Sequence, residues 1–338
     1  DSVFKPILDV PRLPSILYLS CLFVFFGLLA PISAEPIGRL PNTVLDVMPP
    51  SARVDGEIGD MVYMERTCRA IGDTNLRERI VNVAAQEWAF FGMSVLDLTQ
   101  TRESNPNFQP QPWRRTLIAA DEAARVADSI AGYWSSTPNS AWILERQNQS
   151  WEYRGVGSRW RNPWSAAFIS WVMCESGLGE PSRFQRAIAH HSYIDQAIMA
   201  RDDKESGSAY VAYNPGEKEM VPGDMLCRGS RPAYRRIEDR RSQLGQGARS
   251  HCDIVVAVEQ HNDRILLIGG NVRSWVRLKM LPGRVNGKGI FEPEPYNNRQ
   301  IFAHLQLQAA AVPSNAFNQA LTMRQLSCSN AEIPATLC

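Results

Sequence analysis

The chain has 338 residues and an ordinary globular composition, with 44% hydrophobic and 21% charged residues. Its 36 lysines and arginines almost balance its 35 aspartates and glutamates, which excludes net charge as the basis of partner choice. We therefore expect no nucleic-acid partner, and we expect enough apolar residues to build a sizeable core.

The first 34 residues have the pattern of an export signal. Lys5 and Arg12 precede an apolar run over residues 16–30, and a small residue, Ala34, follows at a plausible cleavage point. The run is short for a membrane span. The pattern predicts a signal peptide over residues 1–34 and a periplasmic or secreted protein. The alternative is an uncleaved anchor that tethers the same domain to a membrane.

The cysteines that follow this segment could form disulfides. Of seven cysteines, six lie beyond it, and an even count in an exported chain permits pairing. Cys227 and Cys252 bracket an arginine-rich stretch, and a bond between Cys328 and Cys338 would close the C-terminal tail. Several free buried thiols are the alternative.

Helical periodicity begins after residues 35–72, which are rich in proline and glycine and read as a linker or N-terminal extension. Apolar residues then recur at steps of three and four, with capping residues before them and glycines after them. A polar loop over residues 104–112 separates the first two helices. The predicted helices run from Asp73 to Gly92, over about 117–134, from Pro163 to Gly177 and over about 182–200.

Beyond Val221 the period changes to that of strands. The apolar or alternating runs cover residues 225–227, 253–258, 264–268, 274–280 and 300–306. Helices followed by hairpin-connected strands predict an α+β domain over residues 73–308, with its N-terminal helices packed on a mostly antiparallel sheet. Residues 309–338 read as a C-terminal tail.

One helix start could carry chemistry. The run Pro-Trp-Ser-Ala-Ala-Phe-Ile-Ser-Trp places Ser165 in the first turn of a largely apolar helix. Backbone N–H groups are unpaired there, and the helix dipole favours negative charge, so an oxyanion could be stabilised. Serine is also a common helix cap, which gives a purely structural alternative.

Two later segments add a possible base and a possible orienting group. His251 starts one apolar strand, and Asn271 ends the next. If those strands pair as a hairpin, the two side chains lie near the same end of the sheet. A nucleophile at a helix start, a base on one strand and an amide on its neighbour are the parts of a papain-like triad.

The ordered motifs PWSAAFISW, PGD, HCDIVV and GGNV resemble a bacterial domain family of unknown function that is similar to the CHAP and NlpC-type cell-wall amidases. The resemblance covers about 230 residues of the chain. It implies a papain-like fold and peptidoglycan as the substrate class. It maps the nucleophile, base and orienting residue onto Ser165, His251 and Asn271, with no metal and no organic cofactor.

The sequence departs from that family at the nucleophile, where the amidases carry cysteine. A serine hydroxyl is too weak an acid to form a resting ion pair with imidazolium, so Ser165 needs a neutral histidine that takes its proton during attack. Asp253 is the alternative third residue, because it shares a strand face with His251. The other candidates for the substrate cleft are Trp164, His190, His191 and Asp224.

Two functions follow from these patterns. The first is a peptidoglycan hydrolase that cleaves an amide bond, either an N-acetylmuramoyl-L-alanine amidase or a peptide-stem endopeptidase. The second is a catalytically silent module that binds cell-wall polymer or a partner protein. The segment Arg228–Arg249 holds seven arginines and suits an anionic partner, although it also reads as a solvated, mobile insertion.

Overall fold

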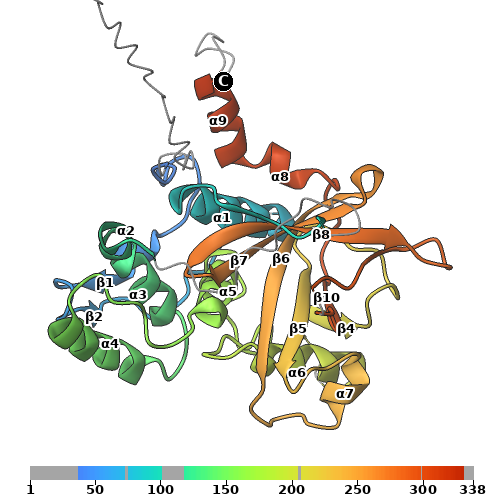
Figure 1. The fold of residues 1–338 in the computed structure, drawn as a ribbon, viewed down its shortest axis with the longest axis horizontal. Coiled ribbons are helices and arrows are strands. Elements are labelled where there is room, and N and C mark those ends of the chain that lie inside the picture. The colour runs from blue at the N-terminus through green and yellow to red at the C-terminus, as the bar shows by residue number, and fades with distance from the viewer. Residues whose placement is uncertain (1–36, 73–74, 101–117, 205–206, 298, 331–338) are drawn as a thin grey trace, which may run out of the picture. The chain divides into compact units, whose positions relative to one another are not determined.

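A mostly antiparallel sheet forms the centre of the computed structural model, which describes residues 37–72, 75–100, 118–204, 207–297 and 299–330 (Figure 1). Its principal path runs β3-β8-β7-β6-β5-β10-β4, and β9 pairs with β8. β3 and β8 are parallel, whereas the other pairs are antiparallel. The strands are β3 (Val95–Asp97), β4 (Tyr210–Tyr213), β5 (Met225–Arg231), β6 (Arg249–Glu259), β7 (Arg264–Val272), β8 (Trp275–Val285), β9 (Phe291–Pro293) and β10 (Ala303–Leu307).

Helices pack on this sheet. α1 (Leu76–Phe90) and α5 (Ser165–Glu175) contact β6 and β7, α3 (Ala127–Ser135) packs on α5, and α6 (His191–Arg201) contacts β4 and β10. The expected α+β class is therefore confirmed, with the parallel β3 making the sheet mixed. The remaining helices are α2 (Ala120–Arg125), α4 (Ala141–Arg154), α7 (Ile237–Arg241), α8 (Ala316–Gln319) and α9 (Leu321–Asn330).

The two faces of the sheet belong to different cores. Ile254 of β6 packs with residues of α1 and α5, whereas its neighbour Val255 joins a smaller cluster that contains Tyr296. Because side chains alternate along a strand, His251 and Asp253 lie on the same face as Val255. We call the two faces the helix face and the Tyr296 face.

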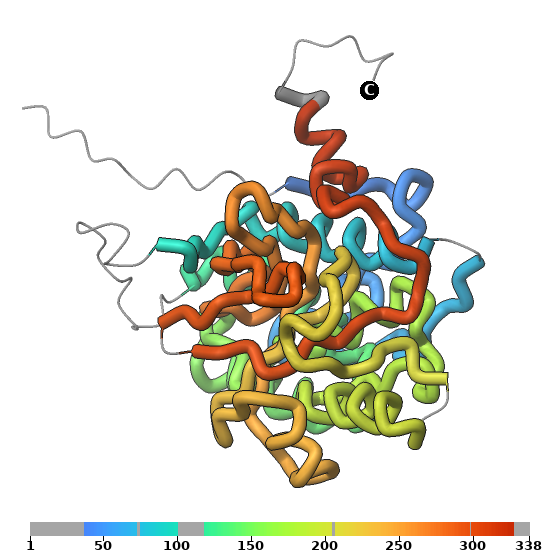
Figure 2. The backbone as a smooth tube through the Cα atoms, turned by 90° about the vertical axis from the view of Figure 1, so that its right-hand side faces the viewer, coloured from blue at the N-terminus to red at the C-terminus, as the bar shows by residue number. Residues whose placement is uncertain are grey.

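The helices differ from the expected ones where local signals were weak. The helix expected over about 117–134 is divided at Val126 into α2 and α3. α4 was not expected, because many of its residues are polar and only a few are buried. The tail from residue 309 includes α8 and α9, which contact α1 and project beside it in Figure 2.

The segment expected to be a linker packs closely against the domain. Leu40, Leu45 and Val47 are buried in the main core. It also contains a 3-10 turn at Pro50–Arg53 and a small hairpin of β1 (Val54–Asp55) and β2 (Val62–Tyr63). Apolar positions scattered among prolines have no helical or strand period, which is why the sequence did not reveal this packing.

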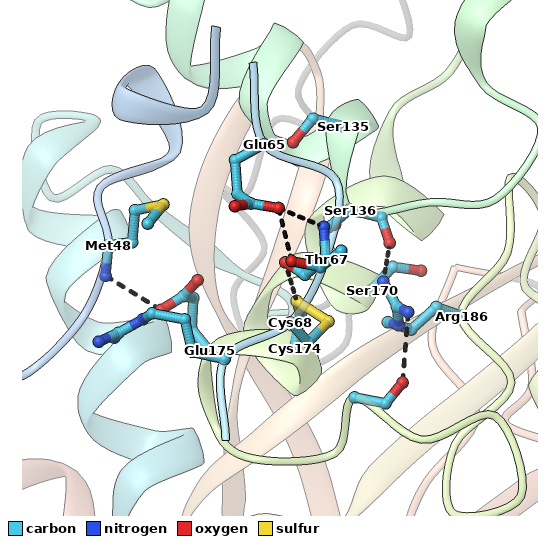
Figure 3. Close-up of a disulfide and its surroundings, with 12 residues drawn as sticks. Met48, Glu65, Thr67, Cys68, Ser135, Ser136, Ser170, Cys174, Glu175 and Arg186 are labelled. Atoms are coloured by element: carbon cyan, nitrogen blue, oxygen red, sulfur yellow. Dashed lines mark hydrogen bonds and ion pairs between the residues drawn. A yellow bond between two sulfur atoms is a disulfide. The ribbon is translucent and has the colours of Figure 1, made fainter. Parts of the chain in front are cut away.

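Two disulfides join distant parts of the chain. Cys227 bonds Cys252 between paired positions of β5 and β6, which confirms that expected pair. Cys68 bonds Cys174 at the end of α5 and was not expected (Figure 3). The expected signal peptide and the partner of Cys328 lie outside the described residues. In the described ranges, the structure contains no helix that is long and apolar enough to cross a membrane.

Candidate functional site

Ser165 occupies the first turn of α5, directly after Trp164 at the N-cap. The helix is apolar on all sides and is buried along its whole length between the sheet and α3. Ser165 itself is only 7% exposed. Burial fixes the position of its hydroxyl, and the unpaired N–H groups of the first turn lie beside it.

His190 contacts Ser165 directly. Its Nε2 lies 2.6 Å from Ser165 Oγ, and its Nδ1 is hydrogen-bonded to the hydroxyl of Tyr193 and, at 3.2 Å, to the backbone N–H of Cys252. A backbone N–H can only donate, so Nδ1 carries a lone pair and the proton resides on Nε2. In this arrangement His190 donates to Ser165 Oγ.

Burial lowers the pKa of His190 well below its ordinary value, and repulsion from His251 adds to this shift. Its ring is therefore neutral at neutral pH, in agreement with the hydrogen bonds at Nδ1. The ring centroids of His190 and His251 lie 5.2 Å apart. The two histidines thus meet at one end of the sheet although they belong to different elements.

His251 belongs to a second polar group on the Tyr296 face. Its Nε2 lies 2.9 Å from Asp253 Oδ1, and the other carboxylate oxygen of Asp253 accepts a hydrogen bond from Lys279. Gly269 makes this possible, because a β-carbon there would lie 1.8 Å from Asp253 Oδ1. Burial opposes ionisation of Asp253, but His251 and Lys279 outweigh it and hold its pKa well below the usual value. Burial lowers the pKa of His251 itself, and Asp253 opposes that shift only in part.

Asn271 lies at the same end of the sheet, in an irregular stretch. β7 and β8 lose their regular register between Gly269 and Val272, and Asn271 adopts a left-handed backbone with φ 55°. Asn271 lines a cavity of about 30 Å³ with Trp160 and Trp164. This volume is about that of one water molecule.

The structure brings together only part of the expected constellation. Ser165 Oγ meets His190, whereas the hydrogen bond described for His251 goes to Asp253. In the part of the chain that the structure describes, no hydrogen bond joins Asn271 to either histidine. The chemical roles assigned to Ser165, His251 and Asn271 remain predictions.

The remaining cleft candidates lie in other surroundings. Asp224 is fully buried and accepts from Arg77 and His304, so it joins β5 to β10 and α1. His191 begins α6 and is half-buried, and burial lowers its pKa. Trp164 packs in the main core, where its ring is tilted against that of Tyr133. Across the described ranges, no cluster of three or more His, Cys, Asp or Glu side chains has the arrangement of a metal site.

Sequence reasoning named Tyr193 only as a possible cleft residue and missed its role in holding the second nitrogen of His190. The signal was present: a histidine and a tyrosine three residues apart at a helix start lie on one face of the helix. It went unused because the order of the motifs directed attention to His251, which starts a strand.

The arginine-rich segment is more ordered than a solvated loop. It contains α7, whose Arg240 is buried and paired with Asp195 at 2.6 Å. Arg241 pairs with Asp202 at 2.9 Å. These ion pairs attach the tip of the β5–β6 hairpin to α6, which lies beside α7 (Figure 1). Arg236 also pairs with Glu238 at 3.3 Å, so three of the seven arginines have internal carboxylate partners.

Comparison with known proteins identifies a bacterial family. The profile of a bacterial family matches residues 121–306, which is more than half of the chain and includes α5, α6 and the strands from β4 to β10. No curated protein and no solved structure matches. The chain therefore belongs to the family described as an uncharacterized protein conserved in bacteria (DUF2272).

Proposed function

We propose that the chain is an exported, papain-like hydrolase that cleaves an amide bond of peptidoglycan, with Ser165 as its nucleophile. The observation that carries the proposal is the 2.6 Å contact between Ser165 Oγ and His190 Nε2 at the start of a buried helix. A nucleophile, a base and a group that orients the base are the minimum for nucleophilic catalysis. Ser165, His190 and Tyr193 fill these roles.

The reaction follows the serine-hydrolase scheme. Ser165 Oγ attacks the carbonyl carbon while His190 Nε2 takes its proton, and N–H groups of the first turn of α5 stabilise the oxyanion. The C–N bond then breaks as His190 gives the proton to the leaving amine. Water, deprotonated by the same nitrogen, hydrolyses the acyl-serine. No metal or organic cofactor is needed for these steps.

The scheme requires a change of tautomer. His190 Nε2 must lose its proton, so Nδ1 must carry one and donate it to the hydroxyl of Tyr193. The backbone N–H of Cys252 then loses its acceptor, which costs about 1–3 kcal/mol. The resting arrangement therefore differs from the reactive one in the loss of the Cys252 hydrogen bond and in the direction of the hydrogen bonds to Tyr193 and Ser165.

Incubation of the purified protein with peptidoglycan, followed by identification of the released fragments, tests the proposal. We expect Ser165→Ala to reduce release by roughly 10³-fold or more. Tyr193→Phe keeps the aromatic packing but removes the acceptor for Nδ1–H, so kcat should fall by about 10²-fold with KM unchanged. Labelling of Ser165 by a fluorophosphonate would show an activated hydroxyl directly. Equal release by wild type and Ser165→Ala would overturn the proposal.

A silent binding module on the same fold is the second candidate. It is favoured by the resting proton on His190 Nε2, which makes Ser165 an acceptor, and by the small size of the adjacent cavity. This candidate predicts no fragment release and no fluorophosphonate label, but retention of the protein on sedimented peptidoglycan.

Two observations support export. Both disulfides are compatible with an oxidising compartment, and the N-terminal sequence has the order of a signal peptide. Fractionation of cells that express the full chain tests this part. Finding the protein in the cytoplasm with its cysteines reduced would contradict it.

A further inference from the structure

Arginines from separate strands gather at the end of the sheet that carries the candidate site. Arg228 stands opposite His251 in the β5–β6 ladder, and Arg277 stands opposite Gly269 in the β7–β8 ladder. Arg273 occupies the turn that joins β7 to β8. We call these three residues the arginine cluster. Arg273 and Arg277 lie four residues apart, whereas Arg228 is distant in sequence, and the sheet brings all three to one end.

Strand alternation places two members of the cluster on the Tyr296 face. Arg228 lies two residues from Leu226, which belongs to the core of that face. Arg277 lies two residues from Lys279, whose ammonium contacts Asp253 there. The neighbours of Arg273 in its turn, Asn271 and Ser274, line the cavity beside Trp164. The cluster thus adjoins the candidate site.

The positive charges at this end of the sheet affect neighbouring arginines. Burial lowers the pKa of Arg277, and the charge of Arg273 lowers it further. Burial also lowers the pKa of the nearby Arg299, and both Arg228 and Arg273 contribute to that shift. Arg273 and Arg277 are therefore close enough to repel each other, and Arg228 and Arg273 both act on Arg299, in surroundings that screen charge less than water does.

The described carboxylates do not neutralise the cluster. Asp253 is the acidic residue in this region, and it is already bound by Lys279 and His251. Within the described ranges, no ion pair joins an aspartate or glutamate to Arg228, Arg273 or Arg277. Arg277 Nε is buried and has no hydrogen-bond partner. A buried N–H group without a partner destabilises the fold unless something else binds it.

The backbone conformation around Arg273 also indicates a binding role for its side chain. Arg273 and Ser274 have left-handed backbones, with φ 55° and 73°, at the centre of a two-residue hairpin turn. Asn-Gly and similar pairs favour such turns, whereas arginine is disfavoured there. Strain of this kind persists where a side chain is needed at a fixed place.

We propose that Arg228, Arg273 and Arg277 form a binding site for an oxyanion group, a carboxylate or a phosphate, of a ligand that reaches this end of the sheet. The guanidinium fork matches both groups with two parallel hydrogen bonds. Binding would satisfy Arg277 Nε and relieve the repulsion. The site stands independently of the proposed hydrolase; if both hold, the substrate carries an oxyanion near its scissile bond.

Titration calorimetry of the full-length protein with inorganic phosphate and with citrate, against sodium chloride at matched ionic strength, tests the site. We expect saturable binding of at least one of the two anions and none of chloride. Arg228→Gln and Arg277→Gln should weaken it about tenfold or more, because each removes charge-assisted hydrogen bonds. The matched control is Arg235→Gln, an exposed arginine with the same charge change, which should bind as wild type does.

Thermal unfolding separates a binding role from a structural one. Without anion, Arg277→Gln should keep or raise the Tm, because it removes repulsion. Added phosphate or citrate should raise the Tm of wild type more than that of the variant. Ser165→Ala should bind the anion normally, so failure of the hydrolase and failure of this site are distinguishable. Absence of saturable binding of either anion, or equal weakening by Arg235→Gln, overturns the proposal.

Discussion

The two ends of α5 are built in contrasting ways. At its C-terminal end, Glu175 accepts from Arg53 at 2.7 Å, from Arg69 at 3.2 Å and from the backbone N–H of Met48 at 3.0 Å. The adjoining Cys174 is bonded to Cys68, as Figure 3 shows. Each charge at this end has a partner on the segment before α1.

At the N-terminal end of α5, the polar groups are not paired with opposite charges in this way. Ser165 relies on the neutral ring of His190, and arginines without carboxylate partners lie nearby. An anchored end fixes the helix in three dimensions, so the other end can hold strained or unsatisfied groups at a constant position. One end of α5 thus stabilises the fold, and the other, which we call the chemically open end, has polar groups that are free to react or to bind. Such a division is expected of a binding or catalytic site.

Removing each disulfide separately should give the largest losses of stability. Comparing the two losses should show which disulfide contributes more to the free energy of unfolding. Cys68–Cys174 spans 106 residues and Cys227–Cys252 spans 25. Loop-closure entropy predicts losses in the free energy of unfolding of about 5 and about 3.5 kcal/mol for the paired alanine variants. Urea unfolding of both variants measures them. A larger loss from the Cys227–Cys252 pair would contradict the view that the Cys68 end carries the stability.

The sequence predicted one of these disulfides for a physical reason. Cys227 and Cys252 flank a hairpin, so strand pairing alone brings them together. Cys68 and Cys174 meet only through tertiary packing of a segment without periodicity, which local patterns cannot show.

Glu175→Ala should destabilise the protein by about 3–5 kcal/mol, because it leaves the fully buried Arg53 without its carboxylate. The exposed Glu152→Ala on α4 is the matched control and should change stability by less than about 0.5 kcal/mol. Urea unfolding monitored by tryptophan fluorescence gives both values. A loss below about 1 kcal/mol for Glu175→Ala would show that Arg53 finds another partner.

The triad expected from the sequence shows what the order of motifs along a chain cannot predict. α5, β6 and β7 were each predicted at nearly their observed places, and the start of β6 does meet the end of β7. Which imidazole meets Ser165 depends on strand face and on the position of α6, and neither can be read from the sequence. Strand alternation aims His251 at the Tyr296 face, whereas the start of α6 delivers His190 to Ser165.

Acid should destabilise the protein through the N-terminal end of α5. Burial lowers the pKa values of His190 and His251, so below pH about 6.5 the unfolded chain binds protons that the folded chain does not. Stability should therefore fall as pH decreases, by up to about 1.4 kcal/mol per pH unit for each histidine. Urea unfolding at pH 7 and pH 5.5 measures this slope. His190→Gln should flatten it and the exposed His261→Asn should not; an unchanged slope in His190→Gln would refute the assignment.

Ser165→Cys should have the smallest effect on stability, about 1 kcal/mol or less, because a thiol nearly matches the hydroxyl in size and His190 can still donate to it. The chemical consequence differs, since a thiol is far more acidic than a serine hydroxyl and becomes a strong nucleophile once deprotonated. Ser170→Cys, at a buried position on the same helix, is the control for a new thiol away from His190. Thermal unfolding and iodoacetamide labelling compare the two variants. Faster labelling at position 165 than at position 170 is expected if the N-terminal end of α5 is the chemically open one.

Two other outcomes of Ser165→Cys are informative. Fragment release that appears in this variant but not in wild type would identify the natural serine as the change that silenced an enzyme. A large fall in Tm would show that the site does not accept a sulfur atom.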